Sequence, residues 1–215
     1  MWLADRGRAK LQAFSTTAGA CLRRNTMARI PLPTPEELDP QQRAVYDKVV
    51  SGPRGRLRGP LRAALYNPVL ADCWQALGAQ LRYSTQLPPE LSELAILVTG
   101  RHCNSPFEWD AHRPEAERAG LAPGIIDALL AQTTPQSMDA RQAAVYHFAL
   151  ELNRSKSVSD ATYATALALF DARTLVELTA LVGYYTLVAM TLNAHEIPLP
   201  DSVMPAFPLP QHAGR

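Results

Sequence analysis

Apolar residues recur along most of the chain at the three- and four-residue spacing of amphipathic helices. No stretch shows the apolar–polar alternation of a half-buried strand. Helices are predicted over residues 41–50, 140–153, 159–170 and 172–192, and Gly120 and Pro123 are expected to separate two more. Proline also marks helix starts at Thr34-Pro35, Asp39-Pro40, Asn67-Pro68 and Pro88-Pro89. The pattern predicts an all-α fold, a helical bundle with short loops.

The composition changes at both ends of the chain. The first 26 residues hold several arginines and a lysine against one acid, Asp5, and resemble an organellar transit peptide. Met27, however, opens a stretch that reads like a natural start, so residues 1–26 are alternatively an upstream extension of the reading frame. We expect disorder or a loose helix there, a helical domain over residues 27–200, and a proline-rich tail over residues 201–215.

The charges nearly cancel, with 21 lysines and arginines against 20 acidic residues, so nothing points to a nucleic-acid partner. The most apolar stretch, residues 175–192, is interrupted by Glu177 and Gly183, and no membrane span is predicted. Charge and hydropathy therefore give no reason to expect a nucleic-acid or membrane partner, and the small-molecule substrate expected for this chain is implied by the resemblance described below.

Three widely spaced cysteines occur, Cys21, Cys73 and Cys103, and no two have C-x-x-C spacing. An odd number of this kind does not build a disulfide framework. Each is expected to be a small buried side chain in a reducing compartment, the cytoplasm, or an organelle if the first 26 residues are a transit peptide.

Residues 93–112 and residues 177–195 echo each other. The first segment reads ELAILVTGRHCNSPFEWDAH and the second reads ELTALVGYYTLVAMTLNAH, one residue shorter. A duplicated unit would explain the echo, although short alanine- and leucine-rich matches also arise by chance. Two related helical units within the bundle are thus one expectation.

The segment NSPFEWDAH admits two interpretations. In the first, Ser105 caps a helix that begins at Pro106, and Glu108 completes a capping box by reaching back to the serine N–H. In the second, Glu108 and His112, four residues apart on one helix face, form an acid–base pair. Pro114 leaves a backbone carbonyl without its usual donor and is expected to bend the helix beside His112.

Glu93 lies in a predicted helix that is apolar nearly all round and is therefore expected to be buried. A buried glutamate must be paired, capped or protonated, and desolvation would raise its pKa toward the range useful for proton transfer. Arg101, two turns further on, is a candidate partner. Alternatively, Glu93 is simply favoured near a helix N-terminus.

The segments ELAIL and NSPFEWDAHRPEAERAGL resemble the carboxymuconolactone decarboxylase family, which shares a fold with alkylhydroperoxidase D. The resemblance covers residues 57–200 and is most specific over residues 93–120. It implies an alkylhydroperoxidase D-like helical bundle.

The peroxidase branch of this superfamily carries C-x-x-C, three residues and a histidine, with a relay glutamate one helix earlier. On this chain the two cysteine positions hold Ser105 and Glu108, the histidine is His112, and the relay glutamate is Glu93. The resemblance thus implies that the peroxide-reducing dithiol is missing.

The decarboxylase branch similarly keeps a glutamate four residues before the histidine, acts on a carboxylated γ-lactone, and uses neither metal nor organic cofactor. The resemblance implies cofactor-free decarboxylation or proton transfer, in which His112 returns a proton to carbon and Glu93 or Glu108 orients it or acts as base. The predicted substrate-binding residues are Arg101, His102, Ser105 and Trp109.

Two histidines have a plainer interpretation. His102 suits a helix end, and His195 has Thr191 where a matching glutamate would stand, so His195 is expected to be structural. A metal is not expected, because the spacing of the His and Glu residues fits no metal motif.

A homo-oligomer (dimer, trimer or hexamer) is expected, because helices apolar on most faces must cover their remaining surface. Two other functions stay open: a peroxidase-like protein that uses Cys103 alone, and a helical oligomer without catalytic activity.

Overall fold

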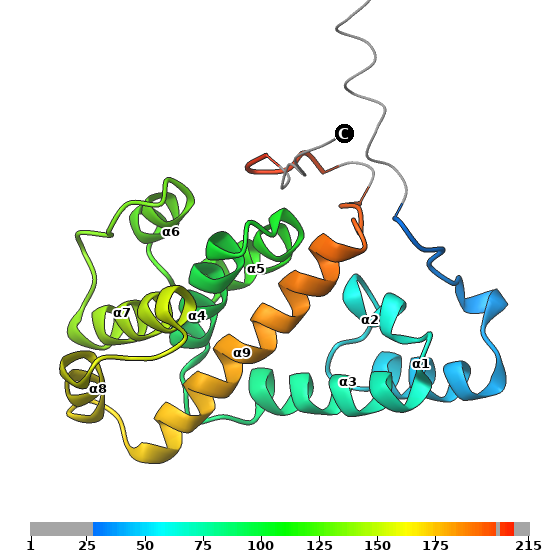
Figure 1. Cartoon of the computed structure of the whole chain (residues 1–215), viewed down its shortest axis with the longest axis horizontal. Helices are drawn as coiled ribbons and strands as arrows, with labels where there is room; N and C mark the ends of the chain where they lie inside the picture. The colour runs from blue at the N-terminus through cyan, green and yellow to red at the C-terminus, as the bar shows by residue number, and fades with distance from the viewer. Residues whose placement is uncertain (1–27, 201–202, 209–215) are drawn as a thin grey trace, which may run out of the picture.

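The computed structural model describes residues 28–200 and 203–208 (Figure 1). The expectation for residues 1–26 lies outside this part. The described residues form one 3-10 helix and nine α-helices: η1 (Pro35–Glu37), α1 (Pro40–Ser51), α2 (Pro60–Ala64), α3 (Pro68–Tyr83), α4 (Pro89–His102), α5 (Pro106–Arg118), α6 (Pro123–Leu130), α7 (Ala140–Ser155), α8 (Asp160–Leu167) and α9 (Ala172–Ala194). The predicted all-α fold is confirmed.

The helices begin and end close to the positions that the sequence predicts. Proline occupies the first position of α1 to α6, and five of the α-helices begin with a side chain that accepts from the first backbone N–H groups: Asp39, Asn67, Asp139, Ser159 and Asp171. Each such cap stabilises a helix by about 1 kcal/mol. Gly120, with φ of +94°, follows the end of α5. The clearest difference is α8, which ends at Leu167 rather than at residue 170.

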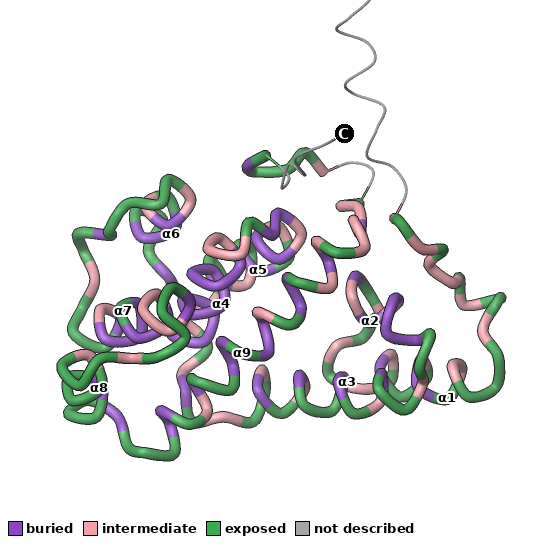
Figure 2. Tube along the Cα trace, viewed as in Figure 1, coloured by how far each residue is buried: buried purple, intermediate pink, exposed green. Residues whose placement is uncertain are grey.

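Helix α4 is the centre of the core. All of its residues from 91 to 100 are buried, as its apolar sequence predicts, and it packs against α5, α7 and α9 (Figure 2). Because α4 is covered on all sides, Glu93 and the face of α5 that meets α4 are withdrawn from solvent.

Helices α1 to α3 lie on the other side of α9 from α6 to α8 (Figure 1). Helices α2 and α3 contact α9, and Lys48 of α1 forms an ion pair with Asp72 of α3 at 2.7 Å. The loop of residues 52–59 joins α1 to α2. This arrangement places the loop opposite the faces of α5 and α9 that carry His112 and Tyr185.

The sequence echo does not correspond to a structural repeat. Residues 93–112 span most of α4, a turn and half of α5, whereas residues 177–195 form one continuous helix, α9, and its C-cap His195. The expectation of two related units based on this echo is therefore wrong.

Helix α9 is, within the described residues, the one helix that is long and apolar enough to cross a membrane by length and composition. The sequence-based expectation that no stretch has this property is thus corrected. Half of its most apolar window is buried inside the fold, where it packs against α4 and α7. These contacts are those of a core helix.

Part of the C-terminal tail packs on the domain. Residues 203–208 form neither helix nor strand, as expected, but Phe207 is only 7% exposed. Its ring meets Trp109 edge-on with the centroids 6.1 Å apart, and the Arg101 guanidinium lies 4.3 Å from the ring centroid. Residues 203–208 of the predicted proline-rich tail thus contact the helical domain through Phe207.

Candidate active site

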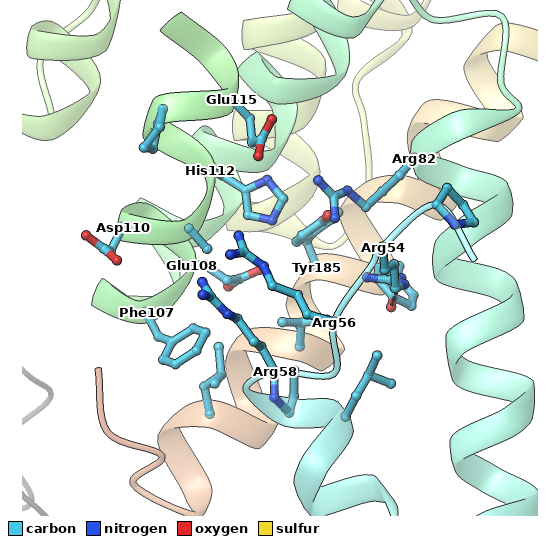
Figure 3. Close-up of a pocket in the computed structure, with 18 of the residues that line it drawn as sticks. Arg54, Arg56, Arg58, Arg82, Phe107, Glu108, Asp110, His112, Glu115 and Tyr185 are labelled. Carbon is cyan, nitrogen blue, oxygen red and sulfur yellow. Dashed lines mark hydrogen bonds between the residues drawn. The ribbon is translucent and has the colours of Figure 1, made fainter. Parts of the chain in front are cut away.

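A cavity of about 650 Å³ opens between α5, α9, the end of α3, the start of α2 and the loop of residues 52–59 (Figure 3). Helix α5 contributes Glu108 and His112, α9 contributes Tyr184 and Tyr185, and α3 contributes Arg82. The cavity thus gathers acids, bases and cations from segments far apart in the sequence.

Glu93 and His112 form a buried pair, of which His112 lines the cavity and Glu93 lies behind it. His112 Nδ1 lies 2.8 Å from Glu93 Oε2, and both side chains are about nine-tenths buried. The Tyr185 ring packs edge-on against the imidazole, with centroids 4.9 Å apart and an interplanar angle of 89°. Because Nδ1 is held by the carboxylate, Nε2 is the ring nitrogen left for a ligand.

Glu108 is the second acid of the site and has a different environment. Its residue is 2% exposed, and neither carboxyl oxygen has a hydrogen-bond partner among the described residues. Burial raises the pKa of Glu108 well above its usual range, and the nearby Ser105 hydroxyl offsets only part of this. Burial therefore favours the protonated form of this carboxyl, which can donate a hydrogen bond.

Of the two interpretations of this segment, the capping box is wrong. Ser105 is the N-cap of α5, but its hydroxyl accepts no bond from the helix, and Glu108 does not reach back to it. Glu108 instead packs toward α4, where a Cβ on Gly100 would lie 3.2 Å from Glu108 Cβ. The missing side chain at Gly100 allows the close approach that buries this carboxyl.

Four arginines line the same cavity as Glu108 and His112. Arg54, Arg56 and Arg58 come from the loop and Arg82 from α3. The buried Nε atoms of Arg54 and Arg82 have no hydrogen-bond partner within the described residues. Burial lowers the pKa of Arg82, but nearby tyrosines and acids, Tyr185 first, outweigh it and leave the pKa raised, so this residue stays charged.

Sequence reasoning missed these arginines. The segment SGPRGRLRGP has the glycine and proline content of a loop, and it carries an arginine at every second position from Arg54 to Arg58. In an extended segment this spacing places side chains on one side. The alternate spacing of the arginines is therefore the feature of the sequence that indicates a shared surface. The sequence does not show which helices that surface faces.

Three predicted substrate-binding residues lie outside this cavity. Arg101 donates to the Leu130 carbonyl oxygen at 2.9 Å and to Asn104 Oδ1 at 2.8 Å, so it is also not the partner of Glu93. Trp109 is in the core against Phe207. His102, at the end of α4, has its pKa lowered, first by burial and then by Lys156 and Arg154. These three predicted residues therefore do not line the cavity that holds His112 and Glu108.

Ser105, the fourth predicted substrate-binding residue, is fully buried beside Glu108 and does not line the cavity wall. Its hydroxyl has no hydrogen-bond partner among the described residues. Ser105 therefore belongs to the surroundings of Glu108 rather than to the ligand-facing surface.

The two cysteines among the described residues differ from each other, and the expectation for Cys21 lies outside this part of the chain. Cys73 is exposed, contrary to prediction, whereas Cys103 is partly buried. Burial raises the pKa of the Cys103 thiol to about 11, so the reactive thiolate is scarce near pH 7. No three metal-binding side chains gather in the part of the chain that the structure describes.

The helices and their arrangement define an alkylhydroperoxidase D-like fold. Residues 68–151 match the model of the Carboxymuconolactone decarboxylase family. Glu93, Glu108, His112 and Arg82 lie inside the matched stretch, whereas the arginine loop precedes it and Tyr185 follows it. No curated protein matches the chain.

Solved structures with this fold include two peroxidase-related proteins described as uncharacterized. The one from Silicibacter sp. TM1040 has 16% identity and a TM-score of 0.67, over 81% of this chain and 92% of that chain. The other, described as an alkylhydroperoxidase AhpD core from Ralstonia eutropha JMP134, has 17% identity and a TM-score of 0.68, over 81% and 93%.

A third similar structure is the debrominase Bmp8 in complex with 2,3,4-tribromopyrrole, with 15% identity and a TM-score of 0.61, over 75% of this chain and 87% of that chain. At such identities the similarity shows the fold alone, because one fold supports many reactions.

Proposed function

We propose that this protein is an enzyme that decarboxylates, or transfers a proton on, a small carboxylated or lactone substrate without an organic cofactor. The observation that carries the proposal is the buried Glu93–His112 pair, 2.8 Å apart, at a cavity that also holds the unpartnered acid Glu108. The family match over residues 68–151 supports the same class of reaction.

In the proposed reaction Glu108 and Glu93 have different roles: Glu108 stabilises the intermediate, and Glu93 acts through His112. Loss of CO2 breaks a carbon–carbon bond and leaves the electron pair on a carbonyl-conjugated carbon, as an enolate. The carboxyl of Glu108, whose protonated form is favoured by burial, donates a hydrogen bond to the enolate oxygen, and the Arg82 guanidinium adds positive charge. Both groups stabilise the charged intermediate more than the ketone or lactone from which it forms.

Proton return to carbon is the role proposed for His112. Its protonated imidazole donates from Nε2, while Nδ1–H stays bonded to the Glu93 carboxylate, which stabilises the imidazolium. The substrate carboxylate is released as CO2, one proton enters the product carbon, and His112 regains its proton from water. Atoms and charges balance without a metal or redox partner.

A screen of carboxylated lactones and β-keto acids tests the proposal. Turnover should release CO2 and, in D2O, place one deuterium on the carbon that carried the carboxylate. His112→Gln should lower the rate by about a hundredfold or more. Turnover that persists in correctly folded His112→Gln would contradict the proposal.

A further inference from the structure

Two adjacent tyrosines of α9, Tyr184 and Tyr185, line the cavity, but their hydroxyl groups have different surroundings. The Tyr184 hydroxyl oxygen accepts a hydrogen bond from Arg54 Nη2 at 3.3 Å. It also lies so close to α3 that a Cβ on Gly78 would be 2.0 Å from it. The Tyr184 hydroxyl is therefore already engaged in holding the loop of residues 52–59 against α3 and α9.

The Tyr185 hydroxyl has no such partner. Tyr185 makes ring contacts with His112 and Tyr184, but its hydroxyl forms no hydrogen bond to any residue that the structure describes. The residue is only 2% exposed, and it is part of the cavity wall. Because a buried phenol normally has a hydrogen-bond partner, we expect a ligand in the cavity to supply one.

The reacting groups of the proposed function surround this hydroxyl. The Tyr185 ring packs edge-on against the His112 imidazole, with the centroids 4.9 Å apart. Figure 3 shows the Tyr185 side chain between Arg82 and Glu108, and the charges of both act on it. A ligand oxygen that accepts from Tyr185 thus lies next to the imidazole that is proposed to return the proton.

Tyr185 keeps its proton over the neutral pH range and so remains a donor. Burial raises the pKa of its phenol well above the ordinary value, and the nearby Arg82 charge offsets only part of this rise. A hydrogen bond from a fixed donor strengthens as the accepting oxygen gains negative charge. A buried tyrosine can therefore stabilise an enolate more than the carbonyl compound from which it forms.

We infer that Tyr185 is a further catalytic residue of this site, and that its hydroxyl donates a hydrogen bond to the enolate oxygen of the intermediate. This inference rests on the proposed function. The proton stays on Tyr185 throughout, so the balance of the reaction is unchanged. The two tyrosines then have separate roles, since Tyr184 holds the loop and Tyr185 contacts the reacting molecule.

Binding of 4-nitrophenol and nitrobenzene tests the inference independently of turnover. The phenolate oxygen is charged and conjugated, like that of an enolate, whereas nitrobenzene has the same ring without this oxygen. The titration is made at a pH where half of the free phenol is ionised, and the absorbance reports which form binds. For the wild-type protein we expect the phenolate to bind more tightly than nitrobenzene by about tenfold or more.

Tyr185→Phe should weaken phenolate binding by about tenfold and leave nitrobenzene binding unchanged. It keeps the ring that contacts His112, so the melting temperature should change by only a few degrees. Tyr184→Phe is the matched control, because it removes the same atom from the neighbouring residue, where the hydroxyl is already bonded to Arg54. It should not weaken phenolate binding.

Kinetics on an identified substrate provide a second measurement. Tyr185→Phe should lower kcat by about a hundredfold and change KM little, because the hydrogen bond reaches full strength only when the oxygen is charged. A residue that served only packing would instead keep kcat in this substitution, since the aromatic ring is retained.

Equal phenolate binding by Tyr185→Phe and the wild-type protein, including no binding by either, would overturn the inference. An equal loss of phenolate binding in Tyr184→Phe, or wild-type turnover in Tyr185→Phe, would also overturn it. Phenolate binding that depends on Tyr185, without decarboxylation of any carboxylated substrate, would instead contradict only the proposed reaction.

Discussion

His112 and Glu93 are joined by a 2.8 Å hydrogen bond between Nδ1 and Oε2, although they are 19 residues apart and lie on different helices. The bond links α5 to the central helix α4 inside the core. It also explains how a carboxylate is tolerated in an apolar helix, since a buried charge needs a partner.

Replacement of Glu93 by glutamine should separate the chemical role of this bond from its structural role. An amide oxygen still accepts from His112 Nδ1–H, so the melting temperature should change by only a few degrees. The negative charge that stabilises the imidazolium is lost, and the rate on any identified substrate should fall by about a hundredfold. Steady-state kinetics with thermal denaturation measure both; near-wild-type turnover in folded Glu93→Gln would contradict the relay role.

The raised pKa of Glu108 should make the free energy of unfolding depend on pH. Its pKa in the folded protein lies well above the ordinary value of 4.5, so the folded state binds more protons than the unfolded state between these two values. The free energy of unfolding therefore falls as the pH rises through this window, by about 1.4 kcal/mol for each pH unit. Below the window the carboxyl is protonated in both states, and the penalty is absent.

Glu108→Gln should remove this slope. Melting curves from pH 4.5 toward neutrality should show the variant gaining on the wild-type protein as the pH rises, while a rate assay shows loss of activity. Glu117→Gln, an exposed change on the same helix, should follow the wild-type curve. Parallel curves for Glu108→Gln and the wild-type protein would show that the carboxyl is not protonated by burial.

The local sequence predicts the helices well because their caps and apolar faces are local features. Asn67-Pro68 and Pro88-Pro89 start helices where expected, and the apolar surroundings of Glu93 correctly predict its burial. The prediction that Arg101 is the partner of Glu93 is wrong, because the actual partner is distant in the sequence. Arg101 is near in sequence, whereas His112 becomes a neighbour only when α5 folds back on α4.

The sequence also does not show how deeply each side chain is buried once the helices pack together. Both interpretations of Glu108 were compatible with its spacing to His112, and the choice depends on Gly100, which makes room for the carboxyl against α4. The sequence shows that residues 52–59 are rich in arginine, but it does not show that they line a cavity. That assignment requires α1 to α3 to be placed against α9, which is a matter of long-range packing.

The protein should not reduce hydroperoxides by a dithiol cycle, because Ser105 and Glu108 cannot close a disulfide. At pH 7.5 Cys103 should also alkylate slowly, since its thiol is partly buried with a pKa of about 11. Mass spectrometry after iodoacetamide treatment compares it with the exposed Cys73. A thiol-dependent peroxidase rate that disappears in Cys103→Ser would contradict this expectation.

Deletion of residues 1–26 should leave the fold intact, whereas deletion of residues 1–29 should not be neutral. Arg29 N donates to the His195 carbonyl oxygen at 2.8 Å, and its guanidinium bonds to Ala194 O at 3.0 Å and to Glu196 at 2.8 Å. Loss of these contacts should cost about 1–2 kcal/mol, seen as a drop of a few degrees in melting temperature. Equal melting temperatures for the two truncated proteins would show that Arg29 does not stabilise the end of α9.

Self-association is the last prediction, and it concerns the outward face of α9. We propose that the protein forms a homo-oligomer through this face, where Val176, Leu187 and Met190 are 69%, 46% and 61% exposed. Their positions at helical spacing make one apolar stripe, and a side chain of this size stabilises an interface by about 1.5–3 kcal/mol when fully buried.

Light scattering at micromolar concentration should therefore report more than one subunit, and Leu187→Glu/Met190→Glu should shift the protein toward the monomer because it places charges in the interface. Leu167→Glu provides the control, since Leu167 is exposed to the same extent, 46%, but belongs to α8. It should leave the mass unchanged. A monomeric wild-type protein would refute the assembly, and equal dissociation by both variants would move the interface away from α9.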